Sequence, residues 1–220
     1  MKKILLSSAL LTLCTGAFAG SLLVTVVDKE GKPVPDAVVV VMPANKLARP
    51  KVALPAQATI TQEKMQFIPS VSLVSVGARL NFINNDTWDH HVRSSPAGMG
   101  QFNATQAGFE LRLEGKSAGK PPKPAEITLD SKPGAVSATL LGCFIHGSMR
   151  GYIYASDSPW AAKTTAEGQA LFEDLPDGAA QVKVWQADQL VDLPVQTHTV
   201  TAAPSQLGMQ LSVVPRRRRS

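Results

Sequence analysis

Cysteine is scarce in this chain of 220 residues, which contains only two. The first, Cys14, lies in an N-terminal stretch with the charged start, apolar middle and small-residue end of a secretory signal peptide, and we expect cleavage after Ala19. The mature chain would keep one thiol, Cys143, which excludes an internal disulfide. A free thiol in an oxidising compartment is prone to oxidation or unwanted pairing. The sequence therefore predicts that Cys143 either binds a metal ion or is buried as a small apolar residue.

Long apolar runs are missing after the predicted signal peptide. The apolar stretch inside the signal, Ile4 to Leu13, is too short to span a bilayer as a helix, and no later segment is long and apolar enough to do so. We therefore expect a periplasmic protein without stable membrane insertion.

The expected folded part also lacks a strong charge of one sign. The formal net charge of +5 includes Lys2 and Lys3 in the signal peptide and the run Arg216–Arg219, so the rest is close to neutral. Because no basic patch with interleaved aromatic residues is present, we expect no nucleic-acid partner. The arginine run is interpreted as a solvated tail. No nucleophile–base pair or carboxylate dyad stands out, so the protein is not expected to be an enzyme.

The pattern of apolar residues indicates β-strands throughout, and no segment has the periodicity of an amphipathic helix. Short runs of branched or apolar residues are separated by Gly, Pro, Asp or Asn, which is typical of an all-β sandwich protein. The runs that we expect to be strands are Leu22–Val27, Ala37–Met42, Val71–Val76, Arg79–Ile83, Phe109–Leu113, Glu126–Leu129, Val136–Leu141, Tyr152–Ala155, Ala179–Trp185 and Gln210–Val214.

Three potential metal ligands lie within one short stretch. Cys143, His146 and Met149 are spaced so that a tight loop could present a thiolate, an imidazole and a thioether to one ion. Thiolate and thioether are soft ligands, and imidazole suits copper in either oxidation state. Cysteine and histidine also suit zinc, but methionine counts against it. This stretch supplies only one nitrogen, so a second histidine is needed.

The second histidine is expected from the pair His90-His91, which precedes Val92. Adjacent side chains of a strand point to opposite faces, so only one of the two can face the metal. The residues alone leave the choice between His90 and His91 open.

Several motifs between residues 56 and 157 resemble the cupredoxins of the plastocyanin and amicyanin type in their order and spacing. The Cys-x2-His-x2-Met loop is the shortest form in that family. With its doubled His-His-Val and the split sandwich described below, the whole chain resembles the plastocyanin-like proteins often labelled methylamine utilization proteins. The motifs are Met65–Pro69, Val71–Gly77, Leu80–Asp86, His90–Val92, Pro133-Gly134 and Cys143–Gly151.

This resemblance implies a Greek-key sandwich that holds one type 1 (blue) copper ion. His90, Cys143, His146 and Met149 would be its ligands, and the exposed edge of His146 would be the port for electrons. Many cupredoxins have asparagine directly after the first histidine, where its side chain ties two loops together. Here that residue is His91, so this tie is in doubt. The ring of His91 could supply the tie and fix the orientation of the ligands. His91 could instead be the ligand in place of His90, but we prefer His90.

Two other segments, Ser21–Pro43 and Lys163–Gln186, together resemble the carboxypeptidase regulatory-like sandwich, which is Ig-like. More than a hundred residues separate them, and an inserted domain is the simplest explanation. The expected organisation is a signal peptide at 1–19, a split sandwich at 20–45 and 158–205, a cupredoxin domain at 46–157, and a C-terminal strand with a basic tail at 206–220. The alternative is one enlarged sandwich.

Three functions are consistent with these features. The first is an exported blue copper protein that carries single electrons between protein redox partners. The second is a periplasmic copper-binding protein that stores, delivers or senses the metal. The third is a β-sandwich interaction module without a metal, in which the Cys-His-Met spacing is incidental.

Overall fold

The computed structural model describes residues 19–46, 48–99, 108–131 and 138–216. Apart from a short 3-10 turn at Gly98-Met99, the elements assigned in these residues are the β-strands β1 to β16, which confirms the all-β prediction. Within the described part of the chain, no helix reaches the length and apolarity that a membrane span needs. The predicted signal peptide lies almost wholly outside the described residues.

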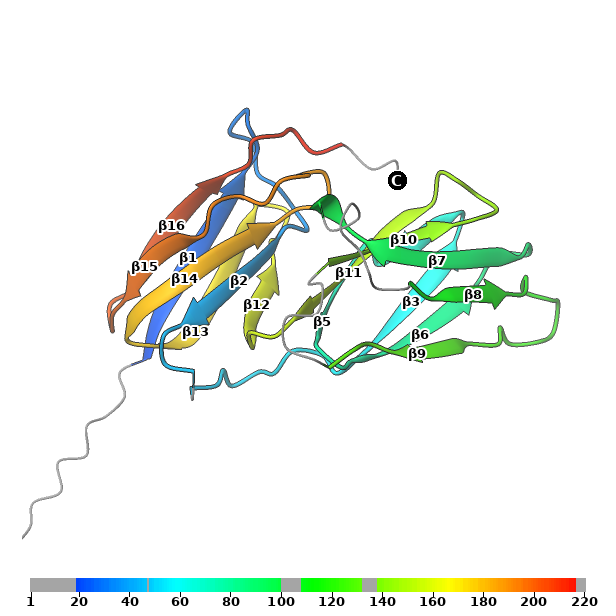
Figure 1. Ribbon diagram of the computed structural model, residues 1–220, viewed down its shortest axis with the longest axis horizontal. Helices are drawn as coiled ribbons and strands as arrows, with labels where there is room; N and C mark the ends of the chain where they lie inside the picture. The colour runs from blue at the N-terminus through cyan, green and yellow to red at the C-terminus, as the bar shows by residue number, and fades with distance from the viewer. Residues whose placement is uncertain (1–18, 47, 100–107, 132–137, 217–220) are drawn as a thin grey trace, which may run out of the picture.

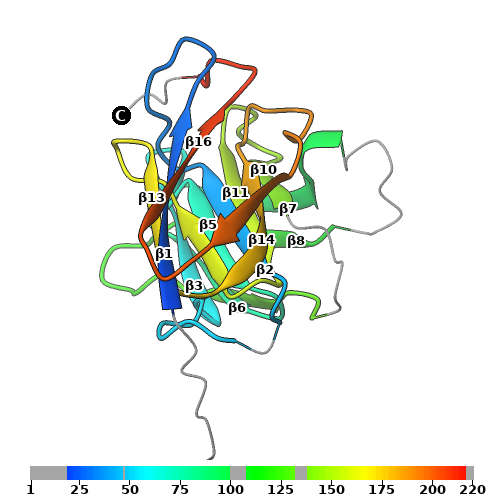
Figure 2. The ribbon, with the colours of Figure 1, turned by 90° about the vertical axis from the view of Figure 1, so that its left-hand side faces the viewer.

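One pair of sheets is built from both ends of the chain. The strand orders are β13-β1-β16 and β12-β2-β14-β15, and Figure 2 shows the first of these sheets facing the viewer. The strands are β1 (Ala19–Val27), β2 (Val38–Pro43), β12 (Trp160–Lys163), β13 (Gln169–Pro176), β14 (Gly178–Trp185), β15 (Gln196–Val200) and β16 (Ser205–Gln210).

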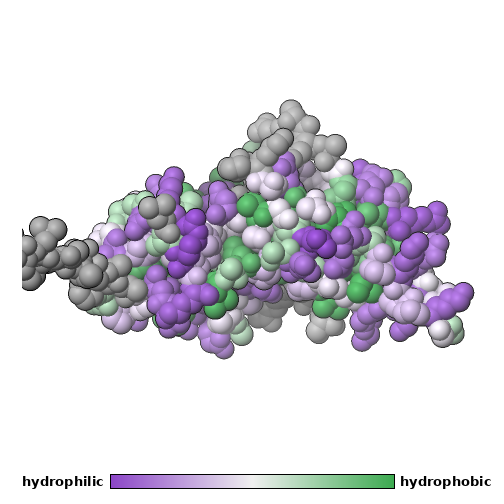
Figure 3. All heavy atoms as spheres, turned by 90° about the horizontal axis from the view of Figure 1, so that it is seen from below, coloured by the Kyte–Doolittle hydropathy of each residue, from purple (hydrophilic) through white to green (hydrophobic). Residues whose placement is uncertain are grey.

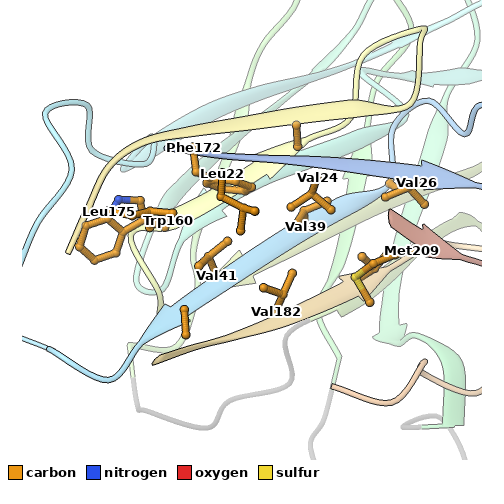
Figure 4. Close-up of a cluster of buried hydrophobic side chains, with 14 of the residues drawn as sticks. Leu22, Val24, Val26, Val39, Val41, Trp160, Phe172, Leu175, Val182 and Met209 are labelled. Carbon is orange, nitrogen blue, oxygen red and sulfur yellow. The ribbon is translucent and has the colours of Figure 1, made fainter. Parts of the chain in front are cut away.

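Alternating apolar side chains form the core between these two sheets. In β1, Leu22, Val24 and Val26 are fully buried, as the period of two in a half-buried strand requires. They pack against side chains that include Val39 and Val41 of β2, and Figure 4 shows these residues between the strands.

The middle of the chain forms a second pair of sheets. Their strand orders are β5-β11-β10-β7-β8 and β4-β3-β6-β9, and a second hydrophobic core lies between them. The strands are β3 (Gln57–Glu63), β4 (Gln66–Ile68), β5 (Val71–Ser75), β6 (Arg79–Asn84), β7 (His90–Pro96), β8 (Glu110–Leu113), β9 (Ala125–Thr128), β10 (Ala138–Cys143) and β11 (Arg150–Ser156).

The two pairs of sheets lie side by side (Figure 1). They share a third core of buried side chains. Four consecutive valines in β2 explain how: Val39 and Val41 face the first core, whereas Val38 and Val40 face the third. A strand buried on both faces is expected to be apolar without alternation. Trp185 completes the contact, because its ring lies 5.5 Å from the rings of both Tyr152 and Tyr154. The predicted domain boundaries and the regulatory-like family of the first pair remain predictions.

The strand expected at Gln210–Val214 is wrong. The last strand, β16, covers Ser205–Gln210 and runs parallel to β1 with Val27 opposite Gln210. It ends there because β1 itself ends at the Asp28 turn, where the carboxylate accepts bonds from the amides of Glu30 and Lys32.

The face seen from below in Figure 3 carries small groups of apolar residues among hydrophilic ones. Such scattered apolar residues are normal on a surface whose large apolar side chains are mostly in cores. This face therefore does not by itself indicate a binding site.

Candidate metal centre

Two neighbouring strands bring His90 and Cys143 to the same end of the second pair of sheets. His90 is the first residue of β7 and Cys143 is the last residue of β10. The two strands are antiparallel, with Cys143 opposite Val92. The amide of Phe144 donates a hydrogen bond of 2.8 Å to the carbonyl of His91, which extends the pairing by one step. In Figure 1 this end of β7 points away from the first pair of sheets.

Three donor atoms converge at this end. The Sγ atom of Cys143 lies 3.6 Å from Nδ1 of His90 and 3.6 Å from Nδ1 of His146, and the two Nδ1 atoms are 3.2 Å apart. A tetrahedral ion with metal–nitrogen bonds of about 2.05 Å and a metal–sulfur bond of about 2.3 Å would separate its donors by about 3.3–3.6 Å. The three distances therefore fit one small metal ion.

The hydrogen bond between His90 and Asp86 determines which ring nitrogen of His90 faces the cluster. His90 is fully buried, and its Nε2 lies 2.9 Å from Oδ2 of Asp86. Nε2–H is therefore the donor to the carboxylate, and Nδ1 keeps a free lone pair. That lone pair faces Nδ1 of His146, so only a proton or another cation between them makes this close approach favourable. This arrangement is the one that a histidine ligand requires.

The turn between β3 and β4 holds Asp86 in place. Lys64 and Met65 have φ values of 53° and 58°, and two successive left-handed residues form a tight turn whose amides can surround an anion. The amide of Lys64 donates to Oδ1 of Asp86 over 2.6 Å, and that of Met65 donates to Oδ2 over 3.1 Å. Burial alone would raise the pKa of Asp86, but bonds from His90 and from these amides outweigh it and hold the pKa below its usual value.

A second buried polar side chain, Asn84, fastens the loop that leads to His90. Its Nδ2 donates to the carbonyls of Trp88 (2.8 Å), Glu114 (3.0 Å) and Leu113 (3.3 Å). Its Oδ1 accepts the amide of Asp86 over 2.9 Å. Neither Asn84 nor Asp86 was predicted from the sequence to have a role at the site. The available signal was a run of polar residues, Asn84 to Asp86, directly after a strand and shortly before a candidate ligand.

The remaining candidates lie in the short loop after β10. His146 is partly exposed, whereas Cys143 is 6% and Met149 is 2% exposed. The amide of Met149 donates to the carbonyl of His146 over 3.0 Å, which closes the loop. Met149 belongs to the same hydrophobic cluster as Cys143. Its role as an axial ligand remains a prediction.

His91 lies outside the cluster of donors. Its Nε2 is 3.3 Å from Oε2 of Glu110, its side chain is 33% exposed, and its ring lies 5.8 Å from that of Phe144. The tie between the two loops is nevertheless present, because the backbone carbonyl of His91 accepts the bond from Phe144. His90, and not His91, thus belongs to the donor cluster, and a main-chain group makes the link that the sequence suggested for a ring nitrogen.

No protein-family model matches this chain, and no curated protein matches it. Solved structures of amicyanin are similar to part of it. Amicyanin from Paracoccus versutus (Thiobacillus versutus) is 16% identical with a TM-score of 0.34, and the match covers 48% of this chain and 92% of that chain. A reduced Cu(I) form of an amicyanin mutant at pH 4 is 17% identical with a TM-score of 0.34, and covers the same shares. An oxidized amicyanin mutant is 18% identical with a TM-score of 0.33, covering 55% of this chain and 99% of that chain.

Proposed function

We propose that this protein is an exported type 1 copper protein that carries single electrons between protein redox partners. The observation that carries the proposal is the set of three donor–donor distances among His90, Cys143 and His146, which fit one small ion. The donor set favours copper, because a thiolate with two imidazoles and a nearby thioether is the set that copper electron-transfer sites use. Met149 would be the weak axial ligand.

The surroundings of the donors suit electron transfer better than catalysis. Bound copper would supply a one-electron change between Cu(II) and Cu(I). Four protein donors leave no open coordination position for a substrate, whereas catalytic metal sites keep one. His90 and Cys143 are buried and held by hydrogen bonds or strand pairing, so His146 is the one of the three that reaches the surface. Its exposed edge is the proposed port for electrons.

Titration of the purified protein with cupric ion tests this proposal. We expect one copper ion per chain, an intense visible thiolate-to-copper band and reversible one-electron cycling. The band should disappear in Cys143→Ser and in His90→Ala. It should persist in the matched variant His91→Ala, because the side chain of His91 points to Glu110.

The alternatives give different results in the same titration. A colourless protein that binds Cu(I) tightly would support a role in copper storage, delivery or sensing. Absence of stoichiometric copper binding would contradict both copper functions and leave the interaction module. Loss of the band in His91→Ala with retention in His90→Ala would reverse the ligand assignment.

A further inference from the structure

A glutamine lies inside the core of the second pair of sheets without a hydrogen-bond partner. Gln62 is fully buried, and neither its Oε1 nor its Nε2 has a partner among the described residues. It follows Ile60 by two residues on β3, so both side chains point to the core-facing side of the strand. Buried amides are nearly always paired, and an unpaired one in a native structure requires an explanation.

Strand pairing places Gln62 at the end of the core where the donors converge. Its carbonyl accepts the amide of Asn85 over 2.8 Å, and Asn85 immediately precedes the Asp86 that holds His90. Two residues farther along the chain, in the β3–β4 turn, Lys64 donates its amide to the same Asp86.

The cross-strand neighbours of Gln62 indicate what its side chain faces. Phe67 on β4 and Asn84 on β6 lie directly opposite it and share its side of the sheet. Phe67 packs on Gly151, two residues after Met149, so closely that a Cβ on Gly151 would lie 2.7 Å from Cβ of Phe67. Phe67 therefore links the position of Gln62 to the segment that follows Met149.

Asn84, the other cross-strand neighbour of Gln62, links it to the strand that carries His90. Asn84 donates to the carbonyl of Leu113, and Leu113 is the strand partner of His90 in the opposite sheet. Gln62 thus lies in the core between Phe67, which packs on the segment after Met149, and Asn84, which bonds to the strand partner of His90. The residues around it are apolar or have their own hydrogen bonds, so the medium screens an amide dipole poorly.

We propose that Gln62 lowers the reduction potential of the centre, an inference that rests on the proposed copper function. An amide with no competing hydrogen bond can turn its oxygen toward a nearby ion, and the negative end of its dipole then stabilises the more positive oxidation state of that ion. In a poorly screened interior this dipole stabilises Cu(II) more than Cu(I). The polarity around a metal site is one of the features that determine its potential.

The test compares Gln62→Leu with Gln57→Leu, an exposed position at the start of the same strand. Voltammetry of the copper-loaded proteins measures the couple in which Cu(II) takes one electron from the electrode to give Cu(I). We expect a higher potential in Gln62→Leu, with the visible band retained, and no change in Gln57→Leu. Thermal unfolding of the copper-free proteins should give a higher midpoint for Gln62→Leu, because an unpaired buried amide is removed.

The possible results separate this inference from the function on which it rests. A potential that is unchanged or lower in Gln62→Leu, while the native protein binds copper normally, overturns the inference alone. Failure of the native protein to bind copper overturns both. If Gln62→Leu folds poorly, Gln62→Ile replaces it, since a β-branched side chain suits a strand, and the same rise in potential is expected.

Discussion

Asp86 is the residue on which the geometry of the centre most depends. Its carboxylate accepts a bond from the His90 ring and bonds from two consecutive amides of the β3–β4 turn. One buried group thereby joins a surface turn to a candidate ligand. Removal of a partner that orients a ligating histidine generally weakens metal binding even though the ligand itself is intact.

We expect Asp86→Asn to raise the copper dissociation constant by about 10- to 100-fold. The asparagine side chain keeps the shape but loses the charge, and its single acceptor oxygen cannot replace both oxygens of Asp86, one of which accepts from Lys64 and the other from His90. A competition titration with a Cu(I) chelator measures the effect. Asp89→Asn is the matched control, because Asp89 bonds to Arg112 and Gly115 rather than to the donor cluster. An equal rise of the copper dissociation constant in both variants would show that the loss of a local negative charge, and not the loss of the bond to His90, weakens copper binding.

At the scale of elements, close contact between β4 and β11 determines the spacing of the two sheets beneath the centre. Gly151 lies against Phe67 with no room for a side chain, whereas Gly147 in the ligand loop has no atom within 4 Å of a Cβ built on it. The same substitution at these two glycines therefore tests packing separately from loop flexibility.

We expect Gly151→Ala to lower the free energy of unfolding by about 1–3 kcal/mol, because the added methyl group overpacks the core. Gly147→Ala should change it by less than about 0.5 kcal/mol, as is usual for an exposed site. Urea denaturation of the copper-free proteins measures both values. If Gly151→Ala leaves the free energy of unfolding unchanged, the two sheets can move apart at this point without loss of other contacts.

Strands with one apolar face could be predicted from the sequence, and strands of mixed polarity could not. Alternation identified β1 and β6 to within a few residues, and the spacing of Cys143 and His146 correctly indicated that they lie together. Strand β3 was missed because Gln62 occupies an inward position that the pattern requires to be apolar. The bond between Asp86 and the β3–β4 turn joins residues 21 or more positions apart, and local patterns carry no information about such contacts.

On the scale of the whole molecule, β10 connects the shared core to the metal centre. Its first residue, Ala138, belongs to the cluster that joins the two pairs of sheets, and its last residue is Cys143. Six residues of strand span roughly 17–20 Å. The shared core and the metal centre are therefore at opposite ends of one strand. Substitutions in the shared core should leave the metal centre intact.

We expect Trp185→Ala to reduce the free energy of unfolding by about 3–5 kcal/mol, as is typical when a buried tryptophan is truncated. The visible copper band should stay unchanged, because Trp185 packs on Tyr152 and Tyr154 and not on the ligands. Chemical denaturation and absorption spectra measure the two effects. Trp88→Ala should lower the free energy of unfolding by less, because the side chain of Trp88 is 43% exposed. A lost band in Trp185→Ala would show that the first pair of sheets helps to form the centre.

The burial of His90 bears on how fast electrons can move. The ring is enclosed by the core and held by a carboxylate that is itself held by two amides, so its position does not depend on the charge of a bound ion. Under the proposed function, the ligand bonds at His90 and Cys143 would change little between oxidation states. Most of the reorganisation energy would then arise in the loop that carries His146, and the length of that loop would influence the rate of electron exchange more than any other part of the fold.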